Sequence, residues 1–350
     1  MLVFFEPVKN IRMKRILAVL GALVVAVVMV LMFLFSYPEP AVDPQWMLES
    51  AEEIPAGALT VRYSGTSTLL FSDGDTSWMV DGWFTRPAPL TLLFGEVAPD
   101  MQAIDYGLAR NEVESLAAVI PVHSHFDHAM DTPEVAKRTG AMVYGSEATA
   151  NIARGWGLPE EQMTLFQNWS PVQLGEFVIT PIESKHFQFP SAEMVETLLT
   201  DSAISQPLVP PVSAFDYKLG KAYVLHVRHP LGTFMVVGSA GFVPGQLEGV
   251  DVDAIFLGVG GLETQSPQYR EEYWSEVVHA TTPQRIFPIH WDSLTASIEK
   301  PFTAEVRITD LLLKNRDALL QYLKEKEAAH PEASFQTLPR FEEVVLFSPL

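Results

Sequence analysis

Short runs of hydrophobic residues recur along residues 57–350 and predict a series of strands. Runs of four to eight apolar residues bounded by turn residues are typical of buried strands. They lie near residues 58–63, 67–72, 77–81, 117–122, 141–144, 176–182, 222–227, 233–238, 253–257, 285–289 and 342–347. Apolar residues at helical spacing predict helices near residues 100–115, 132–139, 146–154, 268–280 and 303–327. Strands in both halves with helices between them favour one α+β domain, a four-layer αββα sandwich over residues 57–350.

The N-terminal part of the chain has a different pattern. Residues 16–35 contain no charged side chain, and twenty apolar residues are enough to cross a bilayer as one helix. Basic residues stand before this run and acidic residues after it, which predicts that residues 1–15 stay in the cytoplasm. The rest is then exported, through a linker at residues 36–56.

A cleaved signal peptide is the alternative to this transmembrane anchor. Its apolar region would be shorter and would end in a small-x-small cleavage site. Here Ser36-Tyr37-Pro38-Glu39-Pro40 follows the apolar run, and this sequence is a poor cleavage site. We therefore expect an uncleaved signal anchor in a single-pass protein of the cytoplasmic membrane. Its main domain is expected outside the cytoplasm, in the periplasm of a Gram-negative cell.

Composition and charge narrow the function classes. The 350 residues include no cysteine, which excludes disulfides, thiolate metal sites and cysteine nucleophiles. The formal net charge is −20, and Lys and Arg form no dense run beyond the N-terminal flank. Nucleic-acid enzymes need a basic surface to meet phosphates, so we expect no nucleic-acid partner. A small-molecule or lipid-derived substrate is consistent with this charge.

The strongest chemical signal is the hexapeptide His123-Ser124-His125-Phe126-Asp127-His128. It follows a predicted buried strand, and strand ends of open α/β folds carry ligand-binding loops. His123 and His125 are two residues apart and project to one side of an extended segment. Asp127 and His128 lie beyond the strand end and can face a second ion. Imidazole and carboxylate are ligands for Zn²⁺, so the hexapeptide predicts a hydrolytic metal site. The alternative is a polar surface loop, which does not explain four ligand-type residues in six positions.

The pattern His-x-His-x-Asp-His resembles the signature of the metallo-β-lactamase superfamily. This resemblance implies that His123, His125 and His186 hold one Zn²⁺ ion. It also implies that Asp127, His128 and His290 hold a second ion. Ser239 stands where the family usually has an Asp that bridges both ions. Two zinc ions are expected, and a single ion is the alternative because this carboxylate is replaced.

Three further residues are candidates for supporting the ligands or contacting substrate. The resemblance implies that Asp81, at the end of a predicted hairpin, orients the ligand loop, and a simple turn residue is the alternative. Ser239 and His226 are the other two candidates. Residues 188–218 are rich in Pro, Ser and Ala, and a loop this long is usually functional or disordered. We expect this insert to cover the metal site as a lid, with apolar contacts from Phe187, Phe189 and Phe215.

These features predict a zinc-dependent hydrolase. A zinc ion lowers the pKa of its bound water to about 7 and so supplies hydroxide. The hydroxide attacks an ester, lactone, amide or phosphodiester, while Asp127 orients it and moves a proton. The alternatives on the same fold are an iron-dependent oxidoreductase and a non-catalytic metal-binding module. Diiron relatives typically carry Glu where His125 stands, and a non-catalytic module does not need six ligands.

Overall fold

The computed structural model describes residues 8–40, 42–50, 53–189, 203–312 and 316–349, and it contains two seven-stranded sheets. The first sheet has the spatial order β14 (Val344–Phe347), β1 (Leu59–Gly65), β2 (Thr68–Ser72), β3 (Ser77–Val80), β4 (Ala118–Ile120), β5 (Met142–Gly145) and β6 (Met163–Leu165). The second has the order β13 (Ser334–Phe335), β12 (Arg285–Ile289), β11 (Ala254–Gly258), β10 (Gly232–Val237), β9 (Ala222–His229), β8 (Phe177–Ser184) and β7 (Val172–Leu174). Both sheets mix parallel and antiparallel pairs.

The two sheets pack face to face around an aromatic core. Phe71 of β2 lies 4.6 Å from Phe234 of β10 and 5.2 Å from Phe256 of β11, measured between ring centroids. Side chains alternate along each strand, so Leu70 and Met79 point to the other face of the first sheet and join a second cluster.

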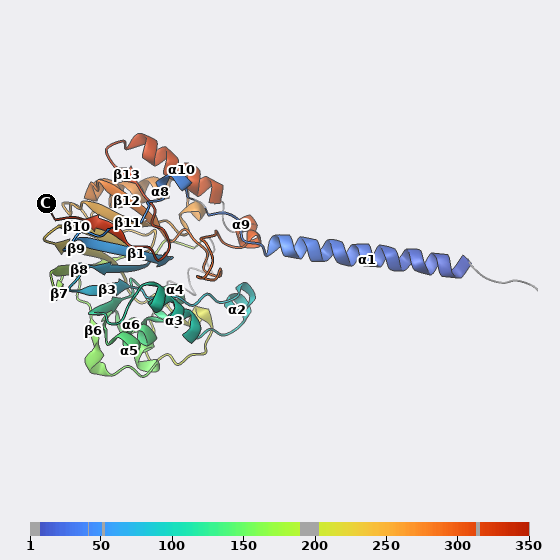
Figure 1. The fold of residues 1–350 in the computed structure, drawn as a ribbon, viewed down its shortest axis with the longest axis horizontal. Coiled ribbons are helices and arrows are strands. Elements are labelled where there is room, and N and C mark those ends of the chain that lie inside the picture. The colour runs from blue at the N-terminus through green and yellow to red at the C-terminus, as the bar shows by residue number, and fades with distance from the viewer. Residues whose placement is uncertain (1–7, 41, 51–52, 190–202, 313–315, 350) are drawn as a thin grey trace, which may run out of the picture.

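Helices cover the outer faces of both sheets. The first sheet is covered by α3 (Met101–Arg110), α5 (Thr132–Thr139) and α6 (Glu147–Gly155), and the second by α8 (Pro267–Tyr273) and α10 (Arg316–Ala329) (Figure 1). This arrangement confirms the predicted αββα sandwich.

The helices differ from the sequence prediction mainly at their ends. The helix expected over residues 100–115 ends at Arg110, and Glu112 then has a positive φ of 56°. The helix expected over residues 268–280 is α-helical only to Tyr273 and continues as a π-helical turn, η6 (Trp274–His279). The helix expected over residues 303–327 appears as α9 (Arg307–Leu312) and α10, and residues 313–315 lie outside the described part.

The N-terminal apolar run forms a long helix, α1 (Val8–Leu34), that projects from the domain (Figure 1). Its segment Met13–Leu34 has 22 residues, a mean hydropathy of 3.1 and no part buried within the protein. Length and composition suit a membrane-spanning helix, and a signal sequence fits the same description.

The chain just after α1 is fixed to the domain rather than extended from it. The backbone N–H of Arg307 donates to the Ser36 carbonyl at 3.0 Å. The Tyr37 hydroxyl donates to the carbonyl of Thr295 at 3.0 Å. Further along the predicted linker, Trp46 is buried in the core. Contacts with the domain therefore begin within a few residues of the end of α1.

Candidate metal centre

Six ligand-type side chains from both sheets meet at one edge of the sandwich. His123 and His125 follow β4, and Asp127 and His128 lie in the short helix α4 (Phe126–Ala129). His186 follows β8 and His290 follows β12. They form two groups, His123/His125/His186 and Asp127/His128/His290, and within each group the ligand atoms lie within 4.8 Å of one another.

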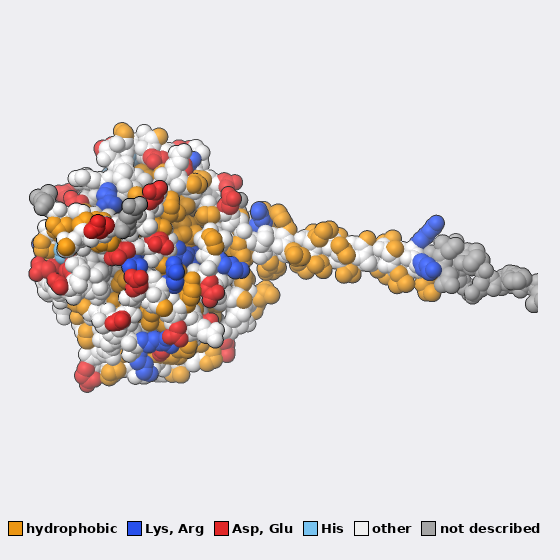
Figure 2. Space-filling model, in the orientation of Figure 1, with side chains coloured by type: hydrophobic (Ala, Val, Ile, Leu, Met, Phe, Trp, Pro, Cys, Tyr) orange, Lys and Arg blue, Asp and Glu red, His pale blue; other side chains and the backbone are white. Residues whose placement is uncertain are grey.

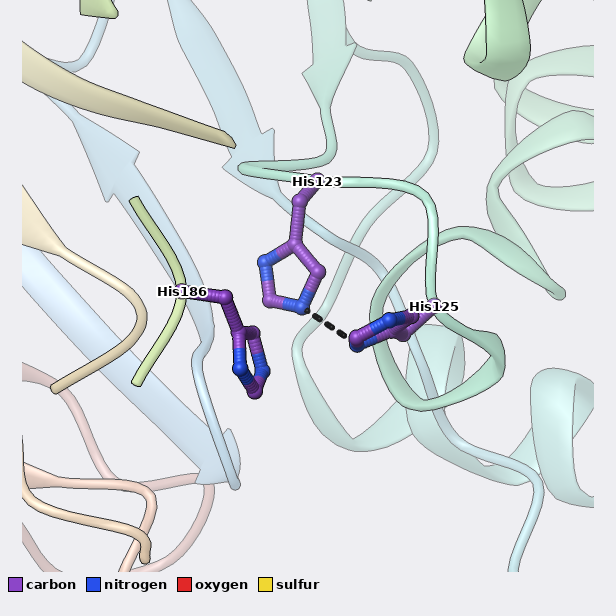
Figure 3. A group of neighbouring side chains, drawn as sticks. All are labelled: His123, His125 and His186. Atoms are coloured by element: carbon purple, nitrogen blue, oxygen red, sulfur yellow. Dashed lines mark hydrogen bonds between the residues drawn. The ribbon is translucent and has the colours of Figure 1, made fainter. Parts of the chain in front are cut away.

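The first group consists of three buried imidazoles. Nε2 of His123 lies 3.1 Å from Nδ1 of His125. The His186 ring centroid is 4.8 Å from that of His125 and 5.0 Å from that of His123. Figure 3 shows His123 and His125, which stand on one loop, and His186, on a separate segment, reaching toward a shared space. Two ligands bound at 2.0–2.1 Å to one tetrahedral ion lie about 3.3 Å apart, so this spacing suits a single small cation.

The second group forms a nearly equilateral triangle of ligand atoms. Nε2 of His290 lies 3.2 Å from Oδ2 of Asp127 and 3.4 Å from Nε2 of His128. The third side, from Nε2 of His128 to Oδ2 of Asp127, is 3.4 Å. All three sides match the edge of a coordination tetrahedron with bonds of 2.0–2.1 Å, which is about 3.3 Å.

Asp81 positions His128 from behind. It directly follows β3 with a positive φ of 60°, and its Oδ2 atom lies 2.9 Å from Nδ1 of His128. Its Oδ1 atom accepts a hydrogen bond from the Val122 backbone N–H at 2.9 Å. The Ser67 hydroxyl is also within 3.1 Å of Nδ1 of His128. These contacts fix the ring so that its Nε2 atom faces the ligand triangle.

His290 is held by its backbone and by a nearby glycine. Its φ is 63°, and its N–H donates to the Thr66 carbonyl at 2.6 Å. Asp292 secures the same turn by accepting from the N–H of Thr66 at 2.6 Å. A Cβ atom at Gly260 would lie only 2.6 Å from Nδ1 of His290. The His290 ring therefore takes its place because residue 260 has no side chain.

Burial and mutual proximity shift the protonation of the ligand groups. Burial and the neighbouring imidazoles lower the pKa of His123 and of His186 well below the ordinary histidine value. Burial opposes the charge on Asp127, but His128 and His290 outweigh it and hold the pKa of Asp127 well below its usual range. Burial also opposes protonation of His128, yet Asp81 and Asp127 raise the pKa of that ring. The centre thus offers neutral imidazoles at His123 and His186 and an ionised carboxylate at Asp127, and such donors suit a divalent cation.

The two other candidate residues lie in different places. Ser239 follows β10, and its hydroxyl accepts a hydrogen bond from the Phe187 N–H at 3.4 Å. It therefore supports the His186 loop with a neutral group. His226 lies inside β9, paired in register with Thr180 and Met235, and it is not among the described residues that line the cavity over the ligands.

This cavity has a volume of about 280 Å³ and is largely apolar. Its base includes His125, Asp127, His186 and His290. The apolar lining comes from several loops and includes Leu92, Leu93, Phe126, Phe187, Phe189, Phe215 and Leu294. Part of the predicted insert 188–218 therefore borders the centre, while its residues 190–202 lie outside the described part.

Sequence reasoning missed some of the residues that shape the centre. Ser67 and Gly260 touch ligand rings only because distant segments meet, and nothing near them in the sequence signals this. Leu92 and Leu93 belong to the helix α2 (Pro89–Phe94). Their signal was an apolar run without charge that directly follows Arg86-Pro87-Ala88.

Comparisons with known proteins show which sequences and folds this chain is similar to. Residues 93–291 match the family model described as a beta-lactamase superfamily domain. A UPF0173 metal-dependent hydrolase from Pyrobaculum islandicum is 22% identical over 274 residues, which cover 75% of this chain and 99% of that protein. A protein of the same name from Myxococcus xanthus is 34% identical over 73 residues, covering 21% of this chain and 25% of that protein.

Among solved structures, this chain is similar to Igni18, described as a novel metallo hydrolase from Ignicoccus hospitalis. The TM-score is 0.50 at 15% sequence identity, and the match covers 82% of this chain and 97% of the other. At this identity the similarity concerns the fold alone.

Proposed function

Because this chain belongs to the β-lactamase superfamily, we propose that it is a zinc-dependent hydrolase with a two-ion centre. His123, His125 and His186 hold one ion, and Asp127, His128 and His290 hold the other. The observation that carries this proposal is the triangle of ligand atoms with sides of 3.2, 3.4 and 3.4 Å. Its relatives named as metal-dependent hydrolases support the same reaction class.

The donor set favours zinc. Five of the six ligands are imidazoles and one is a carboxylate, and the chain contains no cysteine. Nitrogen-rich tetrahedral sites suit Zn²⁺ better than Mg²⁺ or Ca²⁺, which prefer oxygen ligands. When bound, such an ion polarises a substrate oxygen and activates a water molecule at neutral pH.

Asp127 is the proposed catalytic residue as well as a ligand. Its low pKa keeps it ionised at neutral pH, so its carboxylate accepts a hydrogen bond from the attacking water and orients it. It then passes the proton of that water toward the leaving oxygen. The cavity positions the rest of the substrate against apolar side chains.

The cavity favours a carbonyl substrate such as an ester or lactone. Its described lining residues include no Lys or Arg, whereas recognition of a phosphodiester usually relies on such side chains. Aromatic and aliphatic side chains instead suit an acyl group.

We also propose that α1 anchors the protein in the cytoplasmic membrane, with the domain on the outer side. Lys14 and Arg15 precede the apolar segment, as expected for a cytoplasmic N-terminus.

Because the chain has no cysteine, a single Leu165→Cys change gives a unique label site on an exposed strand residue. A membrane-impermeant maleimide should label it in cells with a permeabilised outer membrane and an intact cytoplasmic membrane. Labelling only after lysis would contradict this topology.

The enzymatic proposal is tested on the full chain in detergent. We expect zinc by elemental analysis, hydrolysis of p-nitrophenyl butyrate, loss of activity with a chelator and recovery with Zn²⁺. His125→Ala should abolish turnover, while His279→Ala, in η6, should retain it. Bound iron with oxygen consumption would instead support an oxidoreductase, and absence of bound metal would support a non-catalytic module.

A further inference from the structure

The helix α2 exposes an unusual amount of apolar surface. None of its residues is buried, and Leu90, Leu93 and Phe94 are 58%, 56% and 84% exposed. No charged residue occurs between Pro87 and Gly95. Contiguous exposed apolar side chains of this kind mark a surface that meets a partner or a membrane.

The position of α2 favours the membrane. It lies at the end of the domain from which α1 leaves (Figure 1), and hydrophobic side chains gather around the root of α1 on this end (Figure 2). The uncharged run of twenty residues at 16–35 is about 30 Å long at 1.5 Å per residue, the thickness of a bilayer core. The membrane surface therefore falls near Phe35 and Tyr37, at the end of the domain that carries α2.

The contacts at the root of α1 hold the domain near this surface. Tyr37 is bonded to the Thr295 carbonyl, and Arg307 is bonded to Ser36 through its backbone and through its Nε atom at 3.1 Å. The Arg307 guanidinium also lies over the Phe33 ring at 4.8 Å. With so short a connection, the domain cannot move far from the bilayer.

The same end of the domain forms a wall of the cavity above the ligands. Leu92 and Leu93 of α2 line the cavity, and so does Leu294, which directly precedes the residue that Tyr37 contacts. The apolar lining is thus continuous with the apolar surface of α2, while the ligand residues form the base.

We propose that α2 is embedded in the membrane that α1 spans and that the cavity receives its substrate from this membrane. The substrate class is an amphiphile with an acyl chain joined through an ester. Water adds to the acyl carbon, the bond from that carbon to the alcohol oxygen breaks, and the proton from water moves to that oxygen. A carboxylic acid and an alcohol result. This inference rests on the proposed hydrolase function and on α1 as an anchor.

The location of α2 is tested first, independently of any activity. Phe94→Cys and Leu165→Cys each give the full chain one label site, the second on β6, away from the root of α1 (Figure 1). Each labelled protein is placed in nanodiscs of phosphatidylcholine and phosphatidylglycerol. A fluorophore at residue 94 should be quenched by spin-labelled lipid and protected from iodide, and one at residue 165 should behave in the opposite way. Equal iodide quenching at both positions would overturn the proposal, as would protection at residue 94 without lipid quenching, which indicates a protein partner.

The substrate route is tested with a matched pair of double variants. Leu90→Glu/Phe94→Glu places charges on α2 at residues that do not line the cavity, and Leu165→Glu/Trp169→Glu does the same on other exposed apolar residues. The α2 variant should lose about tenfold or more in kcat/KM for p-nitrophenyl palmitate held in nanodiscs. Its kcat/KM for soluble p-nitrophenyl acetate should stay unchanged, and the control should keep both values.

The outcomes separate this inference from the proposed function. If the protein hydrolyses the acetate but both double variants cleave the palmitate equally well, the membrane route is wrong. The proposed hydrolase function is then still supported. If the wild type cleaves neither ester, the proposed esterase activity fails and so does the substrate route. The fluorescence result then still decides whether α2 lies in the bilayer.

Discussion

The carboxylate of Asp81 and the imidazole of His128 are paired at 2.9 Å, through Oδ2 and Nδ1. A carboxylate at Nδ1 keeps the proton on that nitrogen. It thereby leaves Nε2 as the unprotonated atom that a metal needs. This pairing makes Asp81 a positioning residue: its fully buried side chain serves the centre through His128 and is not itself one of the six ligands.

Asp81→Asn should weaken metal binding. Asn keeps the size, tolerates the positive φ of this position and can still accept the Val122 hydrogen bond through its oxygen. Its amide, however, would donate to Nδ1 of His128 and favour the tautomer with a proton on Nε2. We expect affinity for the ion at the second group to fall about 10- to 100-fold, measured by competition with a zinc chelator dye. Asp75→Asn, in the exposed turn between β2 and β3, is the control, and equal affinity in both variants would contradict the tautomer role.

Gly260→Ala should displace the His290 ring. The added Cβ would come within 2.6 Å of Nδ1 of His290, a distance at which something must shift. The protein should then bind one zinc ion in place of two, because the first group does not include His290. Elemental analysis gives the ratio, and circular dichroism shows whether the fold persists. A folded variant that retains two ions and full activity would show that the ring adapts easily.

Ser239→Asp should raise the affinity of the proposed centre for its two metal ions. In the wild type, the proposed centre balances two divalent cations with only one ligand carboxylate, Asp127. A carboxylate at the end of β10 adds a second negative charge, and we expect about tenfold or greater gain in affinity for the weaker ion. Calorimetric titration measures both steps. Ser239→Asn is the matched neutral control, and the proposed charge effect is wrong if Asn gives the same gain.

Asp131 should make folding stability depend on pH. The side chain is fully buried and accepts hydrogen bonds from the N–H groups of Phe84 and Thr85 and from the Thr85 hydroxyl. Burial outweighs these donors and raises the pKa of Asp131 to about 6, from 3.8. The folded state therefore holds this proton more tightly than the unfolded state. The stabilisation is present below pH 3.8 and is lost as pH rises through about 6.

The expected size of this effect is about 2 kcal/mol between pH 4 and pH 7. It is measured as the difference in unfolding free energy between the wild type and Asp131→Asn, both metal-free and in the same detergent. As pH rises, the unfolding free energy of the wild type should fall relative to that of Asp131→Asn. Parallel stability curves across this range would show that Asp131 titrates near its ordinary value.

The sequence predicted an element best where a single segment carried the whole hydrophobic pattern of that element. β10 and β11 were predicted nearly to the residue because residues 234–237 of β10 and all of β11 are buried and read as apolar runs. β6 was missed because its three residues are exposed or only partly buried, so no apolar run marks it. β13 has only two residues, too few for any periodic pattern.

The same distinction applies to the centre. His123, His125, Asp127 and His128 stand in one hexapeptide, so their spacing alone predicted a common site. The places of His186 and His290 came from a family resemblance, and the structure brings both to the hexapeptide. The contacts of Ser67 with His128 and of Gly260 with His290 depend on how the two sheets pack, which no local pattern records.

The order in which the ligands occur along the chain has a consequence for biosynthesis. The hexapeptide is translated first, and His290 follows His128 by 162 residues. A nascent polypeptide therefore exposes four chelating side chains well before the residue that completes their enclosure is translated. The group Asp127/His128/His290 can be completed only after β12 is translated, and an exported domain would acquire that ion from the compartment in which it folds.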